Sequence, residues 1–358
     1  MKTVNNNAEV DVVSVVIATY NSEKTLGKTL QALRNQSYPQ DKLEIIVVDG
    51  GSCDKTLQIA SDYNCIIVDN PKTEPVHAKL LGTDRATGRY LVTLDHDEVL
   101  ENCNSILCRV NVLKKYSDCK VAFLSGYKRP SDYPLLNQYL SEFGDPFSLY
   151  MYNFSKDYQF YEKALRRRCR VIEETNEYAY MSFLPKKSSV IVELCCLATM
   201  IDLEYFKDVI GITKDSGNLV HAFYLMLKDG CTNVIITKND PLTHYSVDSI
   251  QAYIPKLKWR IMNNVHFEEK AENGFSGRES LQNVSKIKKY GFIPYSIIFP
   301  ISFIHSVTLS LKRKNPIYLM HVVFCLYVSV EIIAQYFLKM TGYVPQFKSY
   351  DGKKKIER

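Results

Sequence analysis

The first hundred residues contain three short, almost uninterrupted runs of aliphatic and β-branched residues. These runs cover residues 12–18, 43–48 and 90–94, and a shorter run covers residues 65–68. Because apolar and polar residues do not alternate in them, we expect strands that are buried on both faces of a parallel sheet. Helical patterns separate the runs, the first with Leu26, Leu30 and Leu33 on one stripe. The alternation predicts right-handed parallel units of an α/β domain.

Polar residues follow the long runs, at the strand ends where open α/β sheets bind their ligands. These residues are Thr19, Tyr20, Asn21, Asp49, Asp95 and Asp97. Only one residue separates Asp95 from Asp97, so both can face one hard divalent cation, which takes oxygen ligands. A solvated acidic turn is the alternative interpretation. The first run is followed by no Gly-x-Gly-x-x-Gly and no Walker A sequence, which argues against dinucleotide-binding and P-loop folds.

Four sequence signals in this region resemble, in order and spacing, the nucleotide-sugar-binding half of family 2 glycosyltransferases. The signals are Val15–Asn21, Val47–Thr56, Ala78-Lys79 with Gly82 and Ala86–Gly88, and Asp95–Asp97. The family consists of inverting, usually metal-dependent enzymes of the GT-A fold. The resemblance implies a Rossmann-like, mostly parallel sheet with helices on both faces. Departures from the family pattern, which bear on the choice of donor, are Gly50, Lys79-Leu80 in place of Arg-Asn, and the large His96.

The resemblance also implies roles for the residues at the strand ends. It assigns the nucleobase and ribose to Thr19, Tyr20 and Asn21. Asp49 would accept a hydrogen bond from the uracil ring, Lys79 would offer a cation to the diphosphate, and Asp95 would lie near the ribose. Asp97 would hold Mg²⁺ or Mn²⁺ against both phosphates. His244, beyond the last expected strand (234–237), would approach the metal or the diphosphate, unless it is a structural histidine.

An inverting transfer needs one carboxylate that removes the proton from the attacking hydroxyl group. The family often supplies it from an acidic pair that opens a helix before a glycine. Here a helix is expected over 219–228, Gly230 ends it, and Lys214–Asn218 occupies the place of the acidic pair. Asp215 is our candidate for the catalytic base. Asp208 and Glu204 are the rivals, and a capping or loop role for Asp215 is the alternative.

The stretch between the two halves is harder to interpret. A helix and a short strand are expected within 104–125, and two strands are expected at 190–192 and 197–201. Residues 131–187 are rich in Tyr and Phe and contain a basic cluster at 166–170. The aromatic residues suit sugar stacking and the arginines suit a lipid phosphate. An exposed helix face over an aromatic core is the alternative.

The last hundred residues are both basic and apolar. Residues 250–260 predict an amphipathic basic helix, suited to a membrane interface or to packing on the catalytic domain. Residues 291–311 contain no Asp, Glu, Lys or Arg, and residues 317–338 contain only Glu331. Both segments reach the length of about 20 residues that spans a bilayer. Pro294 and Pro300 favour a re-entrant or interfacial arrangement of the first segment over two clean spans.

The net charge and the cysteine content of the chain indicate which binding partners and which redox environment to expect. The 358 residues carry a net charge of +6, which suits an anionic membrane surface or a phosphorylated substrate, and no nucleic-acid-binding motif is present. The ten cysteines are scattered, include the adjacent pair Cys195-Cys196, and never form Cys-x-x-Cys. With no secretory signal at the N-terminus, this pattern indicates reduced cytosolic thiols rather than disulfides or a zinc site.

Together these observations predict five segments. They are a disordered tail (1–9), a GT-A domain (10–246, divided into a nucleotide-sugar half 10–103 and an acceptor half 104–246), an amphipathic basic linker (247–289), membrane-associated helices (290–340) and a basic tail (341–358). The expected activity is inverting transfer from a nucleoside diphosphate sugar, most simply UDP-linked, to a lipid-linked or cell-surface glycan. The catalytic domain would lie on the cytoplasmic side of the membrane. A catalytically inactive nucleotide-sugar-binding membrane protein and a nucleotidyltransferase are the alternatives.

Overall fold

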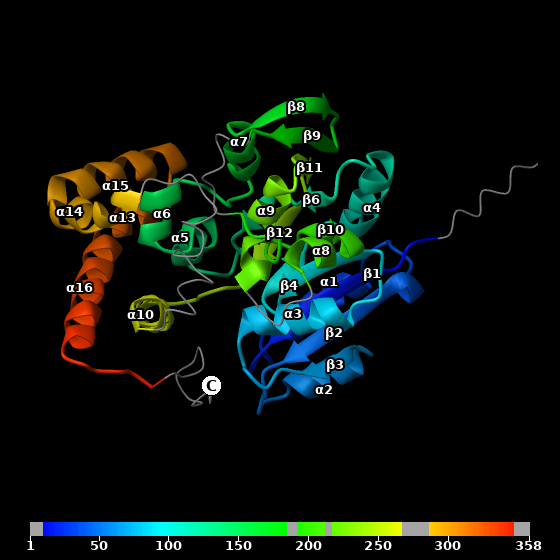
Figure 1. Ribbon diagram of the computed structural model, residues 1–358, viewed down its shortest axis with the longest axis horizontal. Helices are drawn as coiled ribbons and strands as arrows, with labels where there is room; N and C mark the ends of the chain where they lie inside the picture. The colour runs from blue at the N-terminus through cyan, green and yellow to red at the C-terminus, as the bar shows by residue number, and fades with distance from the viewer. Residues whose placement is uncertain (1–9, 185–191, 212–216, 267–285, 347–358) are drawn as a thin grey trace, which may run out of the picture.

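A nine-stranded, mostly parallel sheet forms the centre of the molecule (Figure 1). The computed structural model describes residues 10–184, 192–211, 217–266 and 286–346. The strand order is β3 (Ile66–Asp69), β2 (Leu43–Asp49), β1 (Val13–Thr19), β4 (Tyr90–Asp95), β10 (Met200–Asp202), β6 (Val121–Phe123), β11 (Asn233–Thr237), β9 (Tyr178–Phe183) and β8 (Cys169–Glu174). β1 pairs in parallel with both β2 and β4, and every residue of β1 is buried. The expected parallel α/β sheet is therefore confirmed.

Three helices connect the first four strands. They are α1 (Leu26–Arg34), α2 (Thr56–Asp62) and α3 (Pro75–Arg85). The predicted leucine stripe of α1 is fully buried. α3 packs closely on β1 at Gly82, where an added Cβ would lie 2.2 Å from Cγ1 of Val16. A glycine is thus required for this close helix–strand contact, which fixes the position of Lys79 one turn earlier.

The second half of the domain adds helices and a small sheet beside the strand ends. Its helices are α4 (Ser105–Lys115), α5 (Leu135–Phe143), α6 (Pro146–Tyr152), α7 (Tyr161–Arg166), α8 (Leu203–Ile210) and α9 (Gly217–Lys228). The short η1 (Gln40–Lys42) belongs to the first half, directly before β2. The small sheet has the order β5 (Glu98–Leu100), β12 (Pro241–His244), β7 (Gly126–Lys128). In it His244 lies opposite Glu98, so β12 returns to the turn that follows β4.

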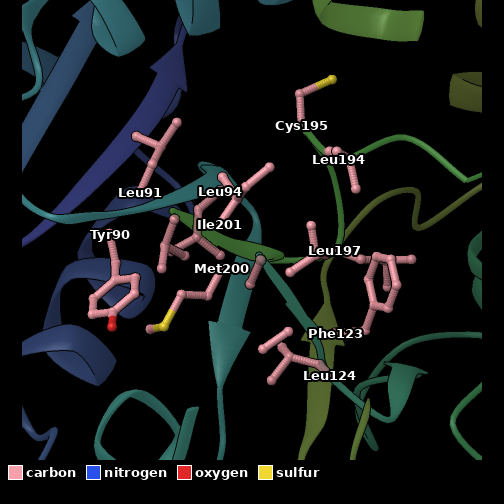
Figure 2. Packing of buried hydrophobic residues seen from close by; sticks show 14 of the residues in the cluster. Tyr90, Leu91, Leu94, Phe123, Leu124, Leu194, Cys195, Leu197, Met200 and Ile201 are labelled. Atoms are coloured by element: carbon pink, nitrogen blue, oxygen red, sulfur yellow. The ribbon is translucent and has the colours of Figure 1, made fainter. Parts of the chain in front are cut away.

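The segment before β10 differs from the expected strand over 197–201. The strand begins only at Met200 and runs antiparallel to both β4 and β6. Leu197 and Ala198 adopt left-handed backbone conformations, with φ of 58° and 45°, which interrupt any extended chain. The apolar composition of this segment instead reflects burial in the core between β4 and β6 (Figure 2). Val190 and Ile191, half of the other expected strand, lie outside the described residues, and Val192 is not in a strand.

The C-terminal helices share a second apolar core with α5 and α6. They are α10 (Ile250–His266), α13 (Lys286–Tyr290), α14 (Phe292–Ile297), α15 (Phe299–Arg313), η3 (Pro316–Leu319) and α16 (Met320–Met340). Residues 287–297 and α15 are bent by 91° where Pro300 follows the break. By length and composition, one helix in the described part of the chain, over 316–340, is able to cross a membrane, or two if the bent pair forms one span.

A buried ion pair joins this helical region to α5. The Glu142 side chain is fully buried, and its carboxylate accepts hydrogen bonds from Nε and Nη2 of Arg313, at 2.8 and 2.5 Å. The hydroxyl groups of Ser155 and Tyr318 donate to the same carboxylate. The guanidinium of Arg313 also lies 3.7 Å from the ring centre of Phe160. Such a fully bonded buried carboxylate locks the helices together.

Candidate active site

A cavity of about 400 Å³ opens where β1 and β4 end. α5, α10 and the segment before β10 complete its walls. The residues predicted from the sequence that line it are Thr19, Tyr20, Lys79, Asp95, Asp97 and His244. Residues from opposite ends of the catalytic domain therefore meet at the carboxyl edge of the sheet, as the strand-end rule predicts.

Lys79 and Asp95 form a close ion pair in this cavity. Nζ of Lys79 lies 2.7 Å from Oδ1 of Asp95, and Lys79 is buried whereas Asp95 is about one-third exposed. Burial alone lowers the pKa of Lys79, but the charge of Asp95 outweighs it and raises the pKa well above its ordinary value. Lys79 thus remains an ammonium ion in a buried site, where a phosphate oxygen is able to compete with Asp95 for it.

Asp97 and His244 form a second pair. Asp97 stands in the turn after β4, and its Oδ2 lies 3.7 Å from Nε2 of His244. Nδ1 of His244 is 3.1 Å from Oγ of Ser141, and the ring stacks on Tyr127 with a centre separation of 4.4 Å. Burial lowers the pKa of His244, although Asp97 and Asp95 oppose this. A neutral imidazole with its second nitrogen already bonded is the form that binds metal ions.

The separation of these two side chains suits a shared cation. Oxygen and nitrogen ligands bind Mg²⁺ and similar ions at about 2.0–2.2 Å, so two ligands of one ion lie about 3–4 Å apart. The 3.7 Å between Asp97 and His244 falls in that range. The residues present therefore fit the divalent cation that the family resemblance implies, with its other coordination positions open to the cavity.

Glu98 and Tyr127 hold the turn that carries Asp97. Glu98 is fully buried, and its carboxylate accepts hydrogen bonds from the Tyr127 hydroxyl and from the backbone N–H of Asp95. Burial, followed by the charge of Asp95, raises the pKa of Glu98 to about 8. The sequence shows Glu98 only as a third acidic residue. Its positioning role depends on Tyr127, which arrives from a distant strand.

Two predicted residues do not line the cavity. Asp49 is buried, and its carboxylate accepts hydrogen bonds from the Thr19 hydroxyl, from Ser52 and from the Gly51 backbone. Asn21, with a φ of 49°, bonds to Ser52 and to the backbone of Cys53. Both residues tie the end of β1 to the loop after β2 and thereby fix the neighbouring Thr19 and Tyr20.

The wall opposite the strand ends is basic. α10 contributes Tyr253, Lys256 and Arg260, and Lys156 lies beside them. Arg260 is 3.8 Å from Asp145 at the start of α6. The sequence marks α10 as a basic helix, but only the fold shows that part of its basic face lines the cavity.

A short segment before β10 supplies the remaining wall, with Glu193, Cys195 and Cys196. Sequence reasoning noted the adjacent cysteines without giving them a role. A hydrogen bond with Cys196 and the charge of Lys79 lower the pKa of Cys195, against the effect of burial. The thiols therefore lie within the electrostatic reach of the residue predicted to hold the diphosphate.

The predicted catalytic base and its two rivals do not appear among the described residues that line the cavity. Asp215 lies outside the described residues, just before α9. Its rivals Glu204 and Asp208 are exposed on α8 and are not among the described residues that line the cavity. The described carboxylates that do line it are Glu74, Asp95, Asp97 and Glu193.

The arginine cluster after α7 has other contacts. Arg166 pairs with Glu162 and Glu174, and Arg168 lies over the ring of Phe154. None of the arginines from 166 to 170 is among the described residues that line the cavity. The contacts of Arg166 and Arg168 are those expected of a helix face over an aromatic core.

Sequence comparisons match the region that builds the donor side of the cavity. Residues 14–104 match the family model described as Glycosyl transferase family 2. The glycosyltransferase AglE of Haloferax volcanii is 34% identical over 91 residues, which cover 24% of this chain and 30% of AglE. A second relative, from Methanococcus voltae, is 34% identical over 87 residues, which cover 22% of this chain and 27% of that protein. It is named dolichyl N-acetyl-alpha-D-glucosaminyl phosphate 3-beta-D-2,3-diacetamido-2,3-dideoxy-beta-D-glucuronosyltransferase. The chain thus matches less than a third of the length of these relatives.

A solved structure extends the likeness to nearly the whole chain. The mannosyltransferase PcManGT of Pyrobaculum calidifontis, in complex with GDP-Man and Mn²⁺, superposes with a TM-score of 0.51 over 91% of this chain and 88% of that one. At 14% identity this likeness shows the fold alone. Residues 14–104 therefore match the Glycosyl transferase family 2 model, and the chain has a fold of the GT-A type.

Proposed function

We propose that the protein is an inverting glycosyltransferase that moves a sugar from a UDP-linked donor to a lipid-linked or membrane-proximal glycan. The observation that carries this proposal is the convergence, in one cavity, of the Lys79–Asp95 pair and the Asp97–His244 pair. Lys79, Asp95 and Asp97 belong to the region that matches the family 2 model, and His244 reaches them from outside that region. A diphosphate that enters between the two pairs meets one ammonium ion and one cation-binding pair.

Each residue of the donor side has a defined task in this proposal. Lys79 exchanges its bond with Asp95 for a phosphate oxygen, and Asp95 is then available to the ribose. Asp97 and His244 would hold Mg²⁺ or Mn²⁺, which acts as a Lewis acid and offsets the charge on the departing diphosphate. Thr19 and Tyr20 frame the nucleoside, and Glu98 keeps the acidic turn in place.

A donor panel tests the proposal directly. UDP-, GDP- and dTDP-sugars are offered with Mn²⁺ to the full-length protein in lipid vesicles, and diphosphate release is measured with and without a polyprenyl-linked glycan. Acceptor-dependent release of UDP supports it. Binding of the nucleotide sugar without any release favours the inactive binding protein, and release of pyrophosphate from a nucleoside triphosphate favours the nucleotidyltransferase.

Asp215→Asn is expected to lower acceptor-dependent transfer by about 10²-fold or more, because general base catalysis contributes about 10²–10⁴-fold. The affinity for the UDP-sugar should stay unchanged, since Asp215 belongs to the acceptor half. The matched control is Asp208→Asn, which removes an exposed carboxylate of α8. A wild-type rate in Asp215→Asn would remove this residue from the mechanism.

The proposed acceptor class follows from the C-terminal helices. α14, α15 and α16 expose a series of large apolar side chains, among them Ile297, Phe299, Ile304, Val330 and Phe337. A surface of this kind on neighbouring elements marks a lipid or protein interface. α10 packs against α16 and also lines the cavity, and Figure 1 shows this helix between α16 and the sheet. Lys256 and Arg260 suit the phosphate group of a lipid-linked acceptor.

Replacing Phe299 and Ile304 together by Glu is expected to shift the protein from membranes to the soluble fraction. These side chains are 51% and 63% exposed, so the change removes lipid contacts without opening the core. Flotation of the purified variant with anionic vesicles measures the shift. Leu57→Glu, on exposed α2 of the sheet domain, serves as the control. Unchanged flotation of the double variant would contradict a lipid-facing α15.

A further inference from the structure

The wall formed by Glu193, Cys195 and Cys196 brings three potential metal ligands together. One carboxylate oxygen and the two sulfur atoms all lie within 4.8 Å of one another. Sγ of Cys196 donates a hydrogen bond to Oε2 of Glu193 at 3.3 Å. Figure 2 shows the thiol of Cys195 directed away from the packed side chains of Leu94 and Met200. The two cysteines thus line the cavity at the edge of the apolar core, to which the buried Cys195 also belongs.

The backbone holds this cluster in a fixed shape. The N–H of Cys196 donates to the carbonyl of Glu193 at 3.2 Å, and the N–H of Thr199 donates to the carbonyl of Cys196 at 3.2 Å. Leu197 and Ala198 then take the left-handed conformations that turn the chain into β10. The guanidinium of the fully buried Arg109 donates to the carbonyl of Ala198. Left-handed non-glycine residues cost energy and persist only where the surroundings impose them.

The chemistry of the three groups differs from that of the Asp97–His244 pair. Thiolates are soft ligands that select Zn²⁺ and similar ions, whereas carboxylates and water suit Mg²⁺ and Mn²⁺. Tetrahedral Zn²⁺ binds sulfur at about 2.3 Å and carboxylate oxygen at about 2.0–2.2 Å, which places its ligand atoms about 3.5–3.8 Å apart. The 4.8 Å that encloses the three ligand atoms exceeds these separations, so binding would have to draw the side chains closer together. The pKa of Cys195 is lowered, first by its hydrogen bond with Cys196 and also by the ammonium group of Lys79, whereas the same hydrogen bond and burial raise the pKa of Cys196. A bound cation would therefore displace the proton of Cys196.

We propose that Glu193, Cys195 and Cys196 bind a thiophilic divalent cation such as Zn²⁺, at a site separate from the hard-cation pair of Asp97 and His244. Three protein ligands leave the fourth tetrahedral position open to the cavity. The ion would therefore stand beside Lys79, in the space that the donor has to enter.

A consequence for catalysis rests on the proposed function. If the cavity binds the donor diphosphate, Zn²⁺ at the thiol site should raise the KM for the UDP-sugar while kcat at saturating donor changes little. The Cys195→Ser/Cys196→Ser variant should lose this effect of Zn²⁺. The effect of Zn²⁺ on KM can be observed only if the protein transfers sugar from a UDP-sugar. The binding measurement below does not depend on transfer, so it tests the metal site separately from the proposed function.

The binding test uses Cd²⁺ as a spectroscopic substitute for Zn²⁺ with the reduced, full-length protein. We expect the ultraviolet thiolate-to-cadmium band to saturate at one equivalent, to disappear in Cys195→Ser/Cys196→Ser, and to be reversed by Zn²⁺. The matched control, Cys53→Ser/Cys103→Ser, removes two exposed thiols and should keep the band. Glu193→Gln should keep the band but weaken the affinity by about tenfold or more.

Two results would overturn the proposal. One is the absence of the band in the wild type at one equivalent, and the other is a band that survives in Cys195→Ser/Cys196→Ser or depends on Cys53 and Cys103. Thermal melting without metal checks that each variant is folded. If the double cysteine variant does not fold, the test rests on Glu193→Gln. An unchanged Cd²⁺ affinity of Glu193→Gln would show that the three groups do not share an ion.

Discussion

Asp97→Asn is expected to lower metal-dependent sugar transfer by about 10³-fold, equivalent to about 4 kcal/mol of transition-state stabilisation. Asn has nearly the shape of Asp but no charge, so it weakens the binding of a hard cation without disturbing the turn. His244, 3.7 Å away, would be left as a single neutral ligand. The affinity for Mn²⁺ and the rate of UDP release should therefore fall together.

The measurement combines Mn²⁺ binding by electron paramagnetic resonance with a coupled assay of UDP release. Glu101→Gln is the matched control, because it removes a partly exposed carboxylate next to β5 that pairs with Lys128 outside the cavity. Excess Mn²⁺ should restore part of the activity of Asp97→Asn, since the defect lies in cation binding. A variant with full activity and the metal requirement of the wild type would show that the cation is held elsewhere.

The donor half could be predicted well because its pattern is local. β1, β2 and β4 are buried on both faces, so their residues had to be apolar without alternation. The residues at the ends of β1 and β4 converge on the cavity as the strand-end rule predicts, whereas Asp49 at the end of β2 does not line it. The resemblance to family 2 glycosyltransferases identified Lys79, which takes the place of an arginine, and the structure shows this residue one turn before Gly82, which the contact with Val16 requires. For the strands, the sequence itself carries the physical constraint.

The rest of the site depends on contacts between distant segments. The pattern of α10 fitted both a membrane interface and packing on the catalytic domain, and only the fold shows that Lys256 and Arg260 line the cavity while the helix packs on α16. The segment 197–201 had the composition of a strand. Its two left-handed residues, Leu197 and Ala198, are not glycines, so nothing in the sequence indicates the turn that they form. Likewise, no spacing rule connects Glu142 with Arg313, which are 171 positions apart.

Arg313→Ala is expected to lower the free energy of unfolding by about 3–5 kcal/mol, because it leaves the carboxylate of Glu142 buried without its counter-ion. The Glu142 side chain has no exposed surface, and it receives two hydrogen bonds from Arg313. Ser155 and Tyr318 continue to donate to it, but neutral donors do not replace the lost charge. Urea unfolding followed by circular dichroism in detergent micelles measures the change.

Two further variants separate the lost charge from the lost packing of the arginine. Arg166→Ala removes a partly exposed arginine with two carboxylate partners, and solvent screening should keep its effect small. Glu142→Gln/Arg313→Ala should be more stable than Arg313→Ala alone, because the amide does not bury an unpaired charge. If both arginine variants lose the same stability, or if the added Glu142→Gln gives no recovery, the ion pair is not what fastens α15 to α5.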